Sequence, residues 1–382
     1  MKAFVFSEKG SIEKKEIDRP SCDEKSVVLT PLYLTICSSD VHTIFSNSIP
    51  RRKDMVLGHE GIAKVVEVGK NVKNFDVGDI VIVPACMPEN GSSGHGTSPF
   101  SGNVLGRNIN GMWAEYFMVP NADNNLVLLP KDIKIENAIL LGDMLATAYT
   151  GVKKIISNNK SCSVLIFGSG AVGLLTVALI RIFFKYKKIM MVGSNNEINI
   201  SLAKEFGINT YISYKDNKVC FGEKEIFNNE KYNRIHDDRE NSKKTPLVDK
   251  IFEYTNNAGF EEIIIAGGNA DTVSIACDVA KYGTGKIINL SYIEGTELSL
   301  PLFSLGKGLA GKTLYFDLCE GGIEFLNELL DIVRDFQKKG VMIDKLFTQK
   351  LVGFDEIPTA LKMMKERKDG TIKVLVDLHE DK

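Results

Sequence analysis

The stretch Cys162-Ser-Val-Leu-Ile-Phe-Gly-Ser-Gly-Ala-Val-Gly173 decides the fold of this chain of 382 residues. An apolar strand runs directly into the pattern Gly168-x-Gly170-x-x-Gly173, and helix-forming residues follow. A second apolar strand, residues 188–193, closes a strand, helix and strand unit of about thirty residues. Glycines at these positions allow a tight turn and let a pyrophosphate approach the helix N-terminus. The sequence therefore predicts a Rossmann domain that binds a dinucleotide.

The residues after this unit continue the alternation of strands and helices that a doubly wound sheet requires. The segments that we expect to form its further elements are residues 198–206, 211–214, 261–266, 271–282 and 286–292. Residues 215–247 break the pattern, because they carry eight basic and seven acidic side chains with few apolar ones. Such a segment has little apolar surface to bury, so we expect a polar, mobile surface insertion without an assigned function.

The N-terminal part, residues 1 to about 130, has the short strands and turns of a β-rich domain. Its runs rich in Val and Ile are residues 26–30, 63–68 and 79–83. Near the end of the sequence, the periodicity predicts amphipathic helices over residues 324–338 and 354–368 and an apolar strand over 372–378. We expect these last elements to return to the first domain. The predicted fold class is α/β, with a β-rich domain and a Rossmann doubly wound parallel sheet.

The composition points to a folded protein with small-molecule partners. Hydrophobic residues make up 44% of the chain, and 47 basic against 49 acidic residues leave a net charge of −2. That balance gives no electrostatic attraction to nucleic acid or to an anionic membrane. The seven cysteines are irregularly spaced and the N-terminus has no apolar signal segment, so we expect a cytoplasmic protein with reduced thiols. No Cys-x-x-Cys pair exists to build a four-thiolate structural zinc site.

The His59-Glu60 pair and Asp143 are two candidate sources of metal ligands. His59 precedes Glu60 after a glycine, and a neutral imidazole with a nearby carboxylate suits Zn²⁺, although such a pair is also common on protein surfaces. Asp143 lies in an apolar helical pattern, between Leu141 and Leu145. If it is buried it needs a partner or a metal, and otherwise it is an exposed acid at a helix start.

The segment Cys37-Ser-Ser-Asp-Val-His42 supplies a thiol, hydroxyls, a carboxylate and an imidazole within six residues. It is a third candidate for the chemistry of a metal site. It also reads as the start of a helix with Ser38 or Ser39 at the N-cap. The two interpretations are compatible.

The order of these motifs resembles that of the zinc-dependent medium-chain alcohol dehydrogenases. The matching motifs are Cys37-Ser-Ser-Asp-Val-His42, Gly58-His-Glu, Gly69, Val77-Gly-Asp79 and Gly168-x-Gly-x-x-Gly173. Further matches are Ile265-Ala-Gly-Gly-Asn-Ala-Asp271, Tyr292 and Leu318-Cys-Glu-Gly-Gly322. The chain is most similar to the branch of NADP-dependent secondary alcohol (isopropanol) dehydrogenases, because Asp143 stands where most relatives have Cys and the four-cysteine zinc lobe is missing. The resemblance covers nearly the full length apart from the insertion.

The resemblance implies one catalytic zinc per chain, held by Cys37, His59 and Asp143, with Glu60 as a carboxylate that exchanges on and off the metal. It implies interconversion of small secondary alcohols and ketones, or aldehydes, by hydride transfer with NADP(H), the zinc polarising the substrate oxygen. The residues implied for proton transfer and orientation are Ser39 as a relay, His42 as its outlet and Asp40 as the partner of His59.

The resemblance also implies a cofactor site. Its residues are Gly168, Gly170, Ala171, Val172 and Gly173 at the pyrophosphate and Gly193, Ser194, Asn195, Tyr214 and Tyr292 elsewhere. Ser194 takes the position, about twenty residues past the fingerprint, where NAD enzymes carry an acid for the ribose 2′-hydroxyl. Gly193 leaves room for a 2′-phosphate, and Tyr214 also matches the NADP branch. Asn195 replaces an arginine of that branch, so one phosphate contact is missing.

The implied organisation is a discontinuous GroES-like catalytic domain, residues 1–146 and 319–382, and a Rossmann cofactor-binding domain, residues 147–318, in a homotetramer. Two departures from the branch concern the substrate pocket. Ala63 replaces a usual glycine, and Arg107 lies near the place of a pocket-lining tryptophan in a shortened loop.

Two alternatives stay open at this point. One is an NAD-linked polyol or amino-alcohol dehydrogenase of the same superfamily, which an acid at position 194 would favour. The other is a zinc-free protein, either a quinone reductase-like enzyme or an NADPH-binding or structural protein. Such proteins lose the zinc ligands, whereas all of the implied ligands are present here.

Overall fold

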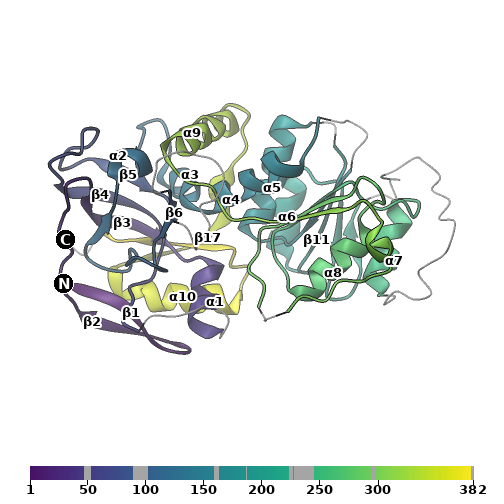
Figure 1. The fold of residues 1–382 in the computed structure, drawn as a ribbon, viewed down its shortest axis with the longest axis horizontal. Helices are drawn as coiled ribbons and strands as arrows, with labels where there is room; N and C mark the ends of the chain where they lie inside the picture. The colour runs from purple at the N-terminus through teal and green to yellow at the C-terminus, as the bar shows by residue number, and fades with distance from the viewer. Residues whose placement is uncertain are drawn as a thin grey trace. The chain divides into compact units, whose positions relative to one another are not determined.

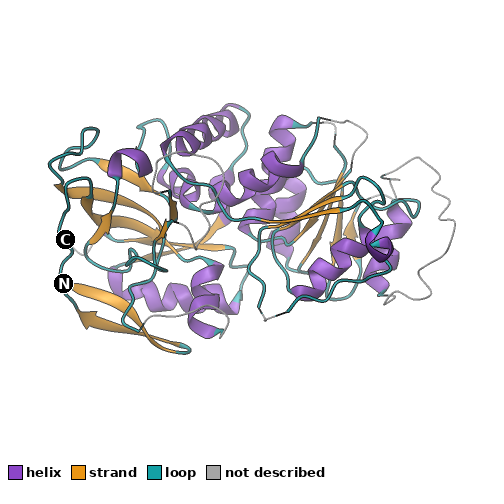
Figure 2. Cartoon of the chain, viewed as in Figure 1, coloured by secondary structure: helices purple, strands orange, loops and turns teal. Residues whose placement is uncertain are grey.

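The computed structural model describes residues 1–46, 53–88, 102–158, 163–185, 187–222, 227, 245–294 and 297–379. The chain forms two compact units, one of Met1–Thr147 with Leu318–Lys382 and one of Ala148–Asp317. Each unit contains a seven-stranded sheet, and both chain termini belong to the first unit (Figure 2). No helix in the described ranges is long and apolar enough to cross a bilayer.

The sheet of the second unit has the strand order of a Rossmann fold. From edge to edge it contains β13 (Val219–Phe221), β12 (Thr210–Ser213), β11 (Ile189–Gly193), β10 (Val164–Phe167), β14 (Glu262–Ile265), β15 (Lys286–Asn289) and β16 (Thr313–Phe316). All neighbours are parallel except β13, which pairs antiparallel with β12. In chain order the six parallel strands run 3-2-1-4-5-6, which is the doubly wound arrangement.

Helices cover both faces of this sheet (Figure 1). They are α5 (Ala171–Phe183), α6 (Glu197–Phe206), α7 (Pro246–Tyr254) and α8 (Ala270–Val279). Leu165 and Phe167 of β10 point into a core shared with α7 and α8, and Ile166 between them points to the other face, because strand side chains alternate. Burial on both faces explains why β10 is apolar throughout.

The first unit is built on a mostly antiparallel sheet. Its order is β17 (Phe347–Val352), β18 (Lys373–Asp377), β3 (Val27–Thr35), β4 (Glu60–Val68), β5 (Ile80–Val83) and β9 (Val127–Leu128), with β8 (Phe117–Val119) also paired to β3. Two small two-stranded antiparallel sheets pair β1 (Lys2–Glu8) with β2 (Ser11–Glu16) and β6 (Cys86–Met87) with β7 (Asn103–Val104). Because β18 pairs with β3, the last strand of the described chain completes the sheet that the N-terminal strands begin.

The remaining helices belong to the first unit or begin in it. They are α1 (Ser38–Phe45), α2 (Ala122–Asn125), α3 (Ile135–Ala138), α4 (Met144–Ile155), α9 (Ile323–Lys338) and α10 (Ile357–Glu366), with short 3-10 turns at η1 (Ile139–Gly142), η4 (Ile343–Leu346) and η5 (Phe354–Glu356). The second unit has one such turn, η3 (Gly306–Gly308). The architecture confirms the predicted α/β fold class.

Several details differ from the expectation. The helical pattern around residue 143 is interrupted, because Asp143 has φ −150° and ψ −61° between η1 and α4. The helix expected over 271–282 ends at Val279. The insertion is not wholly polar surface: Val219–Phe221 forms β13, and Phe227 is buried against Tyr254 and Phe260. Residues 223–226 and 228–244 of the insertion lie outside the described residues.

Candidate active site

Cys37 stands at the point where β3 passes into α1. It is itself the N-cap of α1, so the expected capping by Ser38 or Ser39 is wrong. Its Sγ accepts a hydrogen bond from the Ser39 amide at 3.4 Å, and Asp40 Oδ2 accepts one from the Cys37 amide at 3.0 Å. This reciprocal capping holds the thiol and the Asp40 carboxylate at the start of the helix.

The strand register brings His59 and Glu60 to the same place. β3 and β4 are antiparallel, and Thr35 near the end of β3 pairs with Glu60 at the start of β4. Cys37 lies two residues after the end of β3, and His59 lies one residue before the start of β4. Both residues therefore lie at the same edge of the sheet. Both Cys37 and His59 are buried there.

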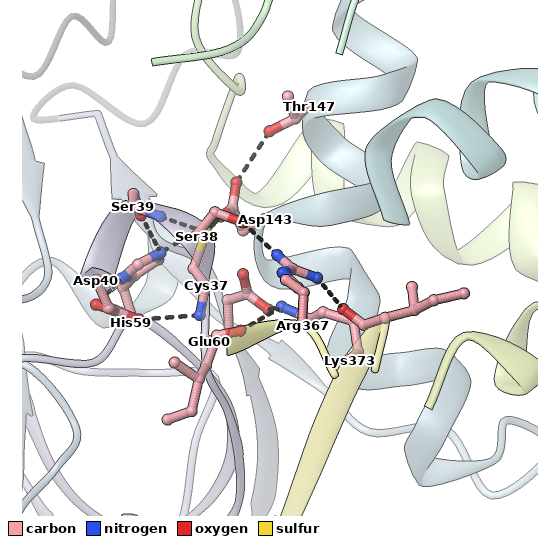
Figure 3. A network of polar contacts seen from close by, with 12 residues as sticks. Cys37, Ser38, Ser39, Asp40, His59, Glu60, Asp143, Thr147, Arg367 and Lys373 are labelled. Carbon is pink, nitrogen blue, oxygen red and sulfur yellow. Dashed lines mark hydrogen bonds and ion pairs between the residues drawn. The ribbon is translucent and has the colours of Figure 1, made fainter. Parts of the chain in front are cut away.

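Asp143 completes this group from a distant part of the chain. It is only 7% exposed, which rules out the interpretation as a surface acid. Its Oδ2 lies 3.2 Å from Cys37 Sγ and 3.3 Å from His59 Nε2, and its Oδ1 accepts a hydrogen bond from Thr147 at 2.9 Å (Figure 3). The break between η1 and α4 places the carboxylate among these groups.

The four side chains have the donor set of a zinc site. The ligand atoms of Cys37, His59, Glu60 and Asp143 all lie within 4.8 Å of one another, and all four residues are buried. Zinc in catalytic sites takes nitrogen, sulfur and carboxylate oxygen from three residues and keeps one position open. Glu60 Oε1 is buried with no hydrogen-bond partner among the described residues, and a buried carboxylate oxygen left unpaired is costly. The residues therefore fit a zinc ion.

Two neighbours orient His59. Asp40 Oδ1 lies 3.2 Å from His59 Nδ1, and Ser39 Oγ lies 3.3 Å from His59 Nε2. A carboxylate on one ring nitrogen fixes the tautomer that presents the other nitrogen to a metal. His42 is half-buried and follows one turn later on α1.

Burial and the charges of neighbouring groups shift the pKa values of the four ligand side chains. Burial, with the charges of Asp143 and Glu60, raises the pKa of the Cys37 thiol to about 12. Burial also raises the pKa of Glu60 to about 7, against the opposing charge of Lys373. Without a cation, Cys37 and Glu60 therefore favour their protonated forms, and a divalent metal would reverse that preference.

His59 and Asp143 behave as a coupled pair. Burial disfavours the charged form of each, but for His59 the charge of Asp40 and the hydrogen bond that its ring donates to Asp143 outweigh burial, and the pKa of His59 rises well above its usual value. For Asp143 the hydrogen bond and the charge of His59 outweigh burial, and the pKa falls. Both shifts favour a protonated imidazole beside an ionised carboxylate when no metal is bound.

Three further residues, which no sequence motif indicated, hold this site. Lys373 Nζ lies 2.6 Å from Glu60 Oε2 and 3.0 Å from the Ile36 carbonyl (Figure 3). Arg367 donates to Ser38 Oγ, and Thr147 donates to Asp143 as described above. A lysine inside an otherwise apolar strand was the available signal for Lys373, because a buried ammonium needs a partner.

The fingerprint turn has the geometry that a pyrophosphate requires. Gly168 has φ +101°, which favours glycine, and a side chain at Gly173 would approach the Gly168 carbonyl to 1.9 Å. At Gly170 a side chain would meet nothing within 4 Å, so the N-terminal end of α5, capped by Gly170, faces open space. These are the three roles that glycines play at a dinucleotide site. The turn therefore fits a dinucleotide, with Ala171 and Val172 in the first turn of the helix.

The expected ribose-end residues follow β11 and β12. Ser194 is half-buried and Asn195 is exposed, directly after the end of β11. Tyr214 is exposed, and its amide donates to the Gly193 carbonyl at 3.0 Å. Tyr292 is half-buried, three residues beyond β15.

Comparison with known proteins identifies the family. The alcohol dehydrogenase GroES-like domain matches residues 23–131. The NADP-dependent isopropanol dehydrogenase of Clostridium beijerinckii is 33% identical over 389 residues, which cover 99% of this chain and 100% of that protein. The chain belongs to the zinc-dependent medium-chain alcohol dehydrogenases. The enzyme of the same name from Thermoanaerobacter brockii is also 33% identical, over 99% of this chain and 100% of that one.

Solved structures of this dehydrogenase family share the fold. The apo form of zinc dependent alcohol dehydrogenase 2 from Streptococcus pneumonia superposes with a TM-score of 0.78 at 24% identity, covering 99% of this chain and 98% of that one. The alcohol dehydrogenase TADH from Thermus sp. ATN1 gives 0.74 at 22% identity, covering 99% and 100%. The recognised resemblance and the predicted fold are confirmed.

Proposed function

We propose that this medium-chain dehydrogenase interconverts small secondary alcohols and ketones by hydride transfer with NADP(H). The observation that carries the proposal is the buried cluster of Cys37, His59 and Asp143, with the unpaired Glu60 Oε1 beside it. The isopropanol dehydrogenases to which the chain is similar support the substrate class and the cofactor. Its partners are small molecules, in keeping with the near-neutral net charge.

Cys37, His59 and Asp143 are the residues that would hold the zinc, with Glu60 as an exchangeable fourth ligand. When bound, zinc supplies a Lewis acid that polarises the oxygen of the alcohol or ketone. Lys373 holds Glu60 Oε2 and leaves Oε1 without a partner, so Oε1 would be available to a metal while the ion pair with Lys373 stays intact.

The proton of the alcohol leaves through the side chains of α1. Ser39 Oγ, 3.3 Å from His59 Nε2, is close enough to the ligand atoms to accept the proton of the substrate hydroxyl while it passes its own hydroxyl proton on. His42, one turn along α1, then carries that proton toward solvent. Asp40 keeps His59 in the tautomer that binds metal through Nε2.

The cofactor binds with its pyrophosphate at the N-terminal end of α5 and its adenosine ribose at the end of β11. When bound, NADP(H) accepts or supplies the hydride. Ser194 donates to a 2′-phosphate, whereas an acid there would repel it. Asn195, Tyr214 and Tyr292 complete the proposed contacts. An acid at position 194 would have supported the NAD-linked polyol dehydrogenase instead.

The proposed organisation is a catalytic domain of residues 1–146 and 319–382, a cofactor domain of residues 147–318, and a homotetrameric assembly in the cytoplasm. The six cysteines in the described ranges are free, as expected in a reducing compartment.

Metal analysis of the purified protein, combined with a panel of ketones and both reduced cofactors, tests the proposal. We expect one zinc per chain and faster reduction of small ketones with NADPH than with NADH. A zinc-free protein that reduces quinones would support the quinone reductase alternative. A higher kcat/KM with NADH and a polyol substrate would support the NAD-linked one.

A further inference from the structure

Tyr211 and Ser169 surround the main chain at the end of β11. Tyr211, on β12, is fully buried, and its phenol hydroxyl donates to the Ser194 carbonyl at 2.7 Å. Ser169 lies in the fingerprint turn, and its Oγ accepts from the Ser194 amide at 3.2 Å. Both main-chain polar groups of Ser194 are therefore bound by side chains at the point where the sheet no longer pairs them.

The same two side chains explain the glycine at 193. A side chain there would lie 2.2 Å from the Tyr211 hydroxyl and 2.5 Å from Ser169 Oγ. The space beside Gly193 is thus filled by these hydroxyls, so packing alone requires a glycine at this position. Gly193 allows Tyr211 and Ser169 to reach Ser194.

The rest of the loop after β11 is held as firmly. The Gly193 carbonyl accepts from the Tyr214 amide, and Asn196 caps α6 by accepting from two amides of its first turn. The Asn199 side chain donates to the Ser169 carbonyl at 2.5 Å, which ties α6 to the fingerprint turn. Burial raises the pKa of Tyr211 to about 12, so its hydroxyl stays a donor at physiological pH.

We propose that Tyr211 is a positioning residue for NADPH: through the Ser194 main chain, it holds the Ser194 hydroxyl toward the cofactor 2′-phosphate. The inference rests on the proposed use of NADP(H). It follows because Asn195 offers no charged contact, so the neutral donor at Ser194 depends on a fixed geometry to favour the phosphate.

The test compares the Kd of NADPH and NADH, followed by nicotinamide fluorescence, in the zinc-loaded wild type and variants. Tyr211→Phe removes only the hydroxyl and should weaken NADPH about fivefold. For NADH, which has no 2′-phosphate, we expect a change of less than about twofold. Tyr254→Phe, a buried tyrosine on α7, is the matched control and should leave both constants unchanged.

A double-mutant cycle separates positioning from a general structural role. In a Ser194→Ala background, Tyr211→Phe should change the Kd of NADPH by less than about twofold, because the group through which it acts is gone. An equal loss for both cofactors, no loss for either, or an undiminished effect in that background would overturn the inference. If Tyr211→Phe does not fold, Ser169→Ala removes the other anchor and should produce the same selective loss, and an equal loss for both cofactors there overturns the inference.

The affinities of the wild type for NADPH and NADH separate a failure of the proposed function from a failure of the role of Tyr211. If the wild type binds NADPH no better than NADH, the proposed use of NADP(H) fails and this inference fails with it. A wild type that prefers NADPH, with a uniform effect of Tyr211→Phe, overturns the role of Tyr211 alone.

Discussion

Lys373 Nζ lies 2.6 Å from Glu60 Oε2, and both side chains are buried although they are 313 residues apart in the sequence. The lysine also donates to the Ile36 carbonyl at 3.0 Å, next to Cys37. One residue thereby connects the last described strand, the first residue of β4 and the end of β3. Because both side chains are buried, removal of either charge leaves the other buried without a partner, which is costly.

The first prediction concerns this ion pair. Lys373→Met leaves the Glu60 carboxylate unpaired and should lower the free energy of unfolding by about 3 kcal/mol, measured by urea denaturation of the zinc-loaded protein. Lys373→Met with Glu60→Gln should recover most of that loss. Lys350→Met on the neighbouring strand β17 removes a pair with Asp377 in which the lysine is exposed, and should cost less than about 1 kcal/mol. Equal effects of the two single substitutions would contradict the structural role of Lys373.

The second prediction concerns the metal ligands. Cys37→Ser or Asp143→Ala should abolish turnover while leaving the fold and NADPH binding largely intact, since the ligands form one open site and the fingerprint turn belongs to the other unit. Metal analysis, circular dichroism and cofactor titration measure the three properties. Cys220→Ser, at an exposed thiol on β13, is the control and should behave as wild type. Two zinc ions per wild-type chain, or full activity in either ligand variant, would be incompatible with this account.

Local sequence was sufficient for the Rossmann unit. The fingerprint, its preceding strand and its following helix are contiguous, so their periodicity and glycines predict the turn without knowledge of any distant residue. The zinc site is different, because Cys37 and Asp143 are 106 residues apart and their 3.2 Å contact depends on the β3–β4 register and on the break before α4. Only the resemblance to a family linked them in advance.

Other features were out of reach of pattern reasoning for the same reason. Capping by Cys37 depends on hydrogen bonds of its thiol and of the Asp40 carboxylate to main-chain amides at the start of α1. N-cap preferences favour serine at such a position. The hydrogen bond from Tyr211 to the Ser194 carbonyl depends on two parallel strands ending side by side. Each of these contacts is set by tertiary structure rather than by neighbours in the sequence.

The third prediction concerns deletion of the segment Phe221 to Lys244, which a wholly polar surface insertion would tolerate. That deletion would remove part of β13 and the buried Phe227, whose amide also donates to the Tyr254 carbonyl at 2.7 Å. Phe227→Ala should cost about 3 kcal/mol of unfolding free energy, because it leaves a cavity against Tyr254 and Phe260.

Deletion of residues 228–244 alone should keep stability and activity near those of the wild type, since their composition is charged and loop closure depends only weakly on length. Thermal unfolding and steady-state kinetics of the two deletions would show the difference. Loss of cofactor affinity or of assembly in the shorter deletion would instead assign a function to this segment.

The fourth prediction concerns cofactor choice. Ser194→Asp should shift preference toward NADH, because a carboxylate accepts from the ribose hydroxyl and repels a phosphate. Asn195→Arg should tighten NADPH by about 1 to 2 kcal/mol with little change for NADH, since it adds a charge-assisted contact. The ratio of kcat/KM values for the two cofactors measures both effects. If the wild type already had the higher kcat/KM with NADH, the assignment of this site to NADP(H) would be wrong.

The central claim is that the cluster of Cys37, His59, Asp143 and Glu60 holds a zinc ion needed for ketone reduction by NADPH. The most direct test is the rate of NADPH oxidation with a small ketone before chelation, after removal of the metal and after zinc is restored. The account predicts that the ketone-dependent rate disappears with the metal and returns on addition of one equivalent of zinc, while NADPH still binds throughout. An unchanged ketone-dependent rate in protein shown to be free of metal would contradict it.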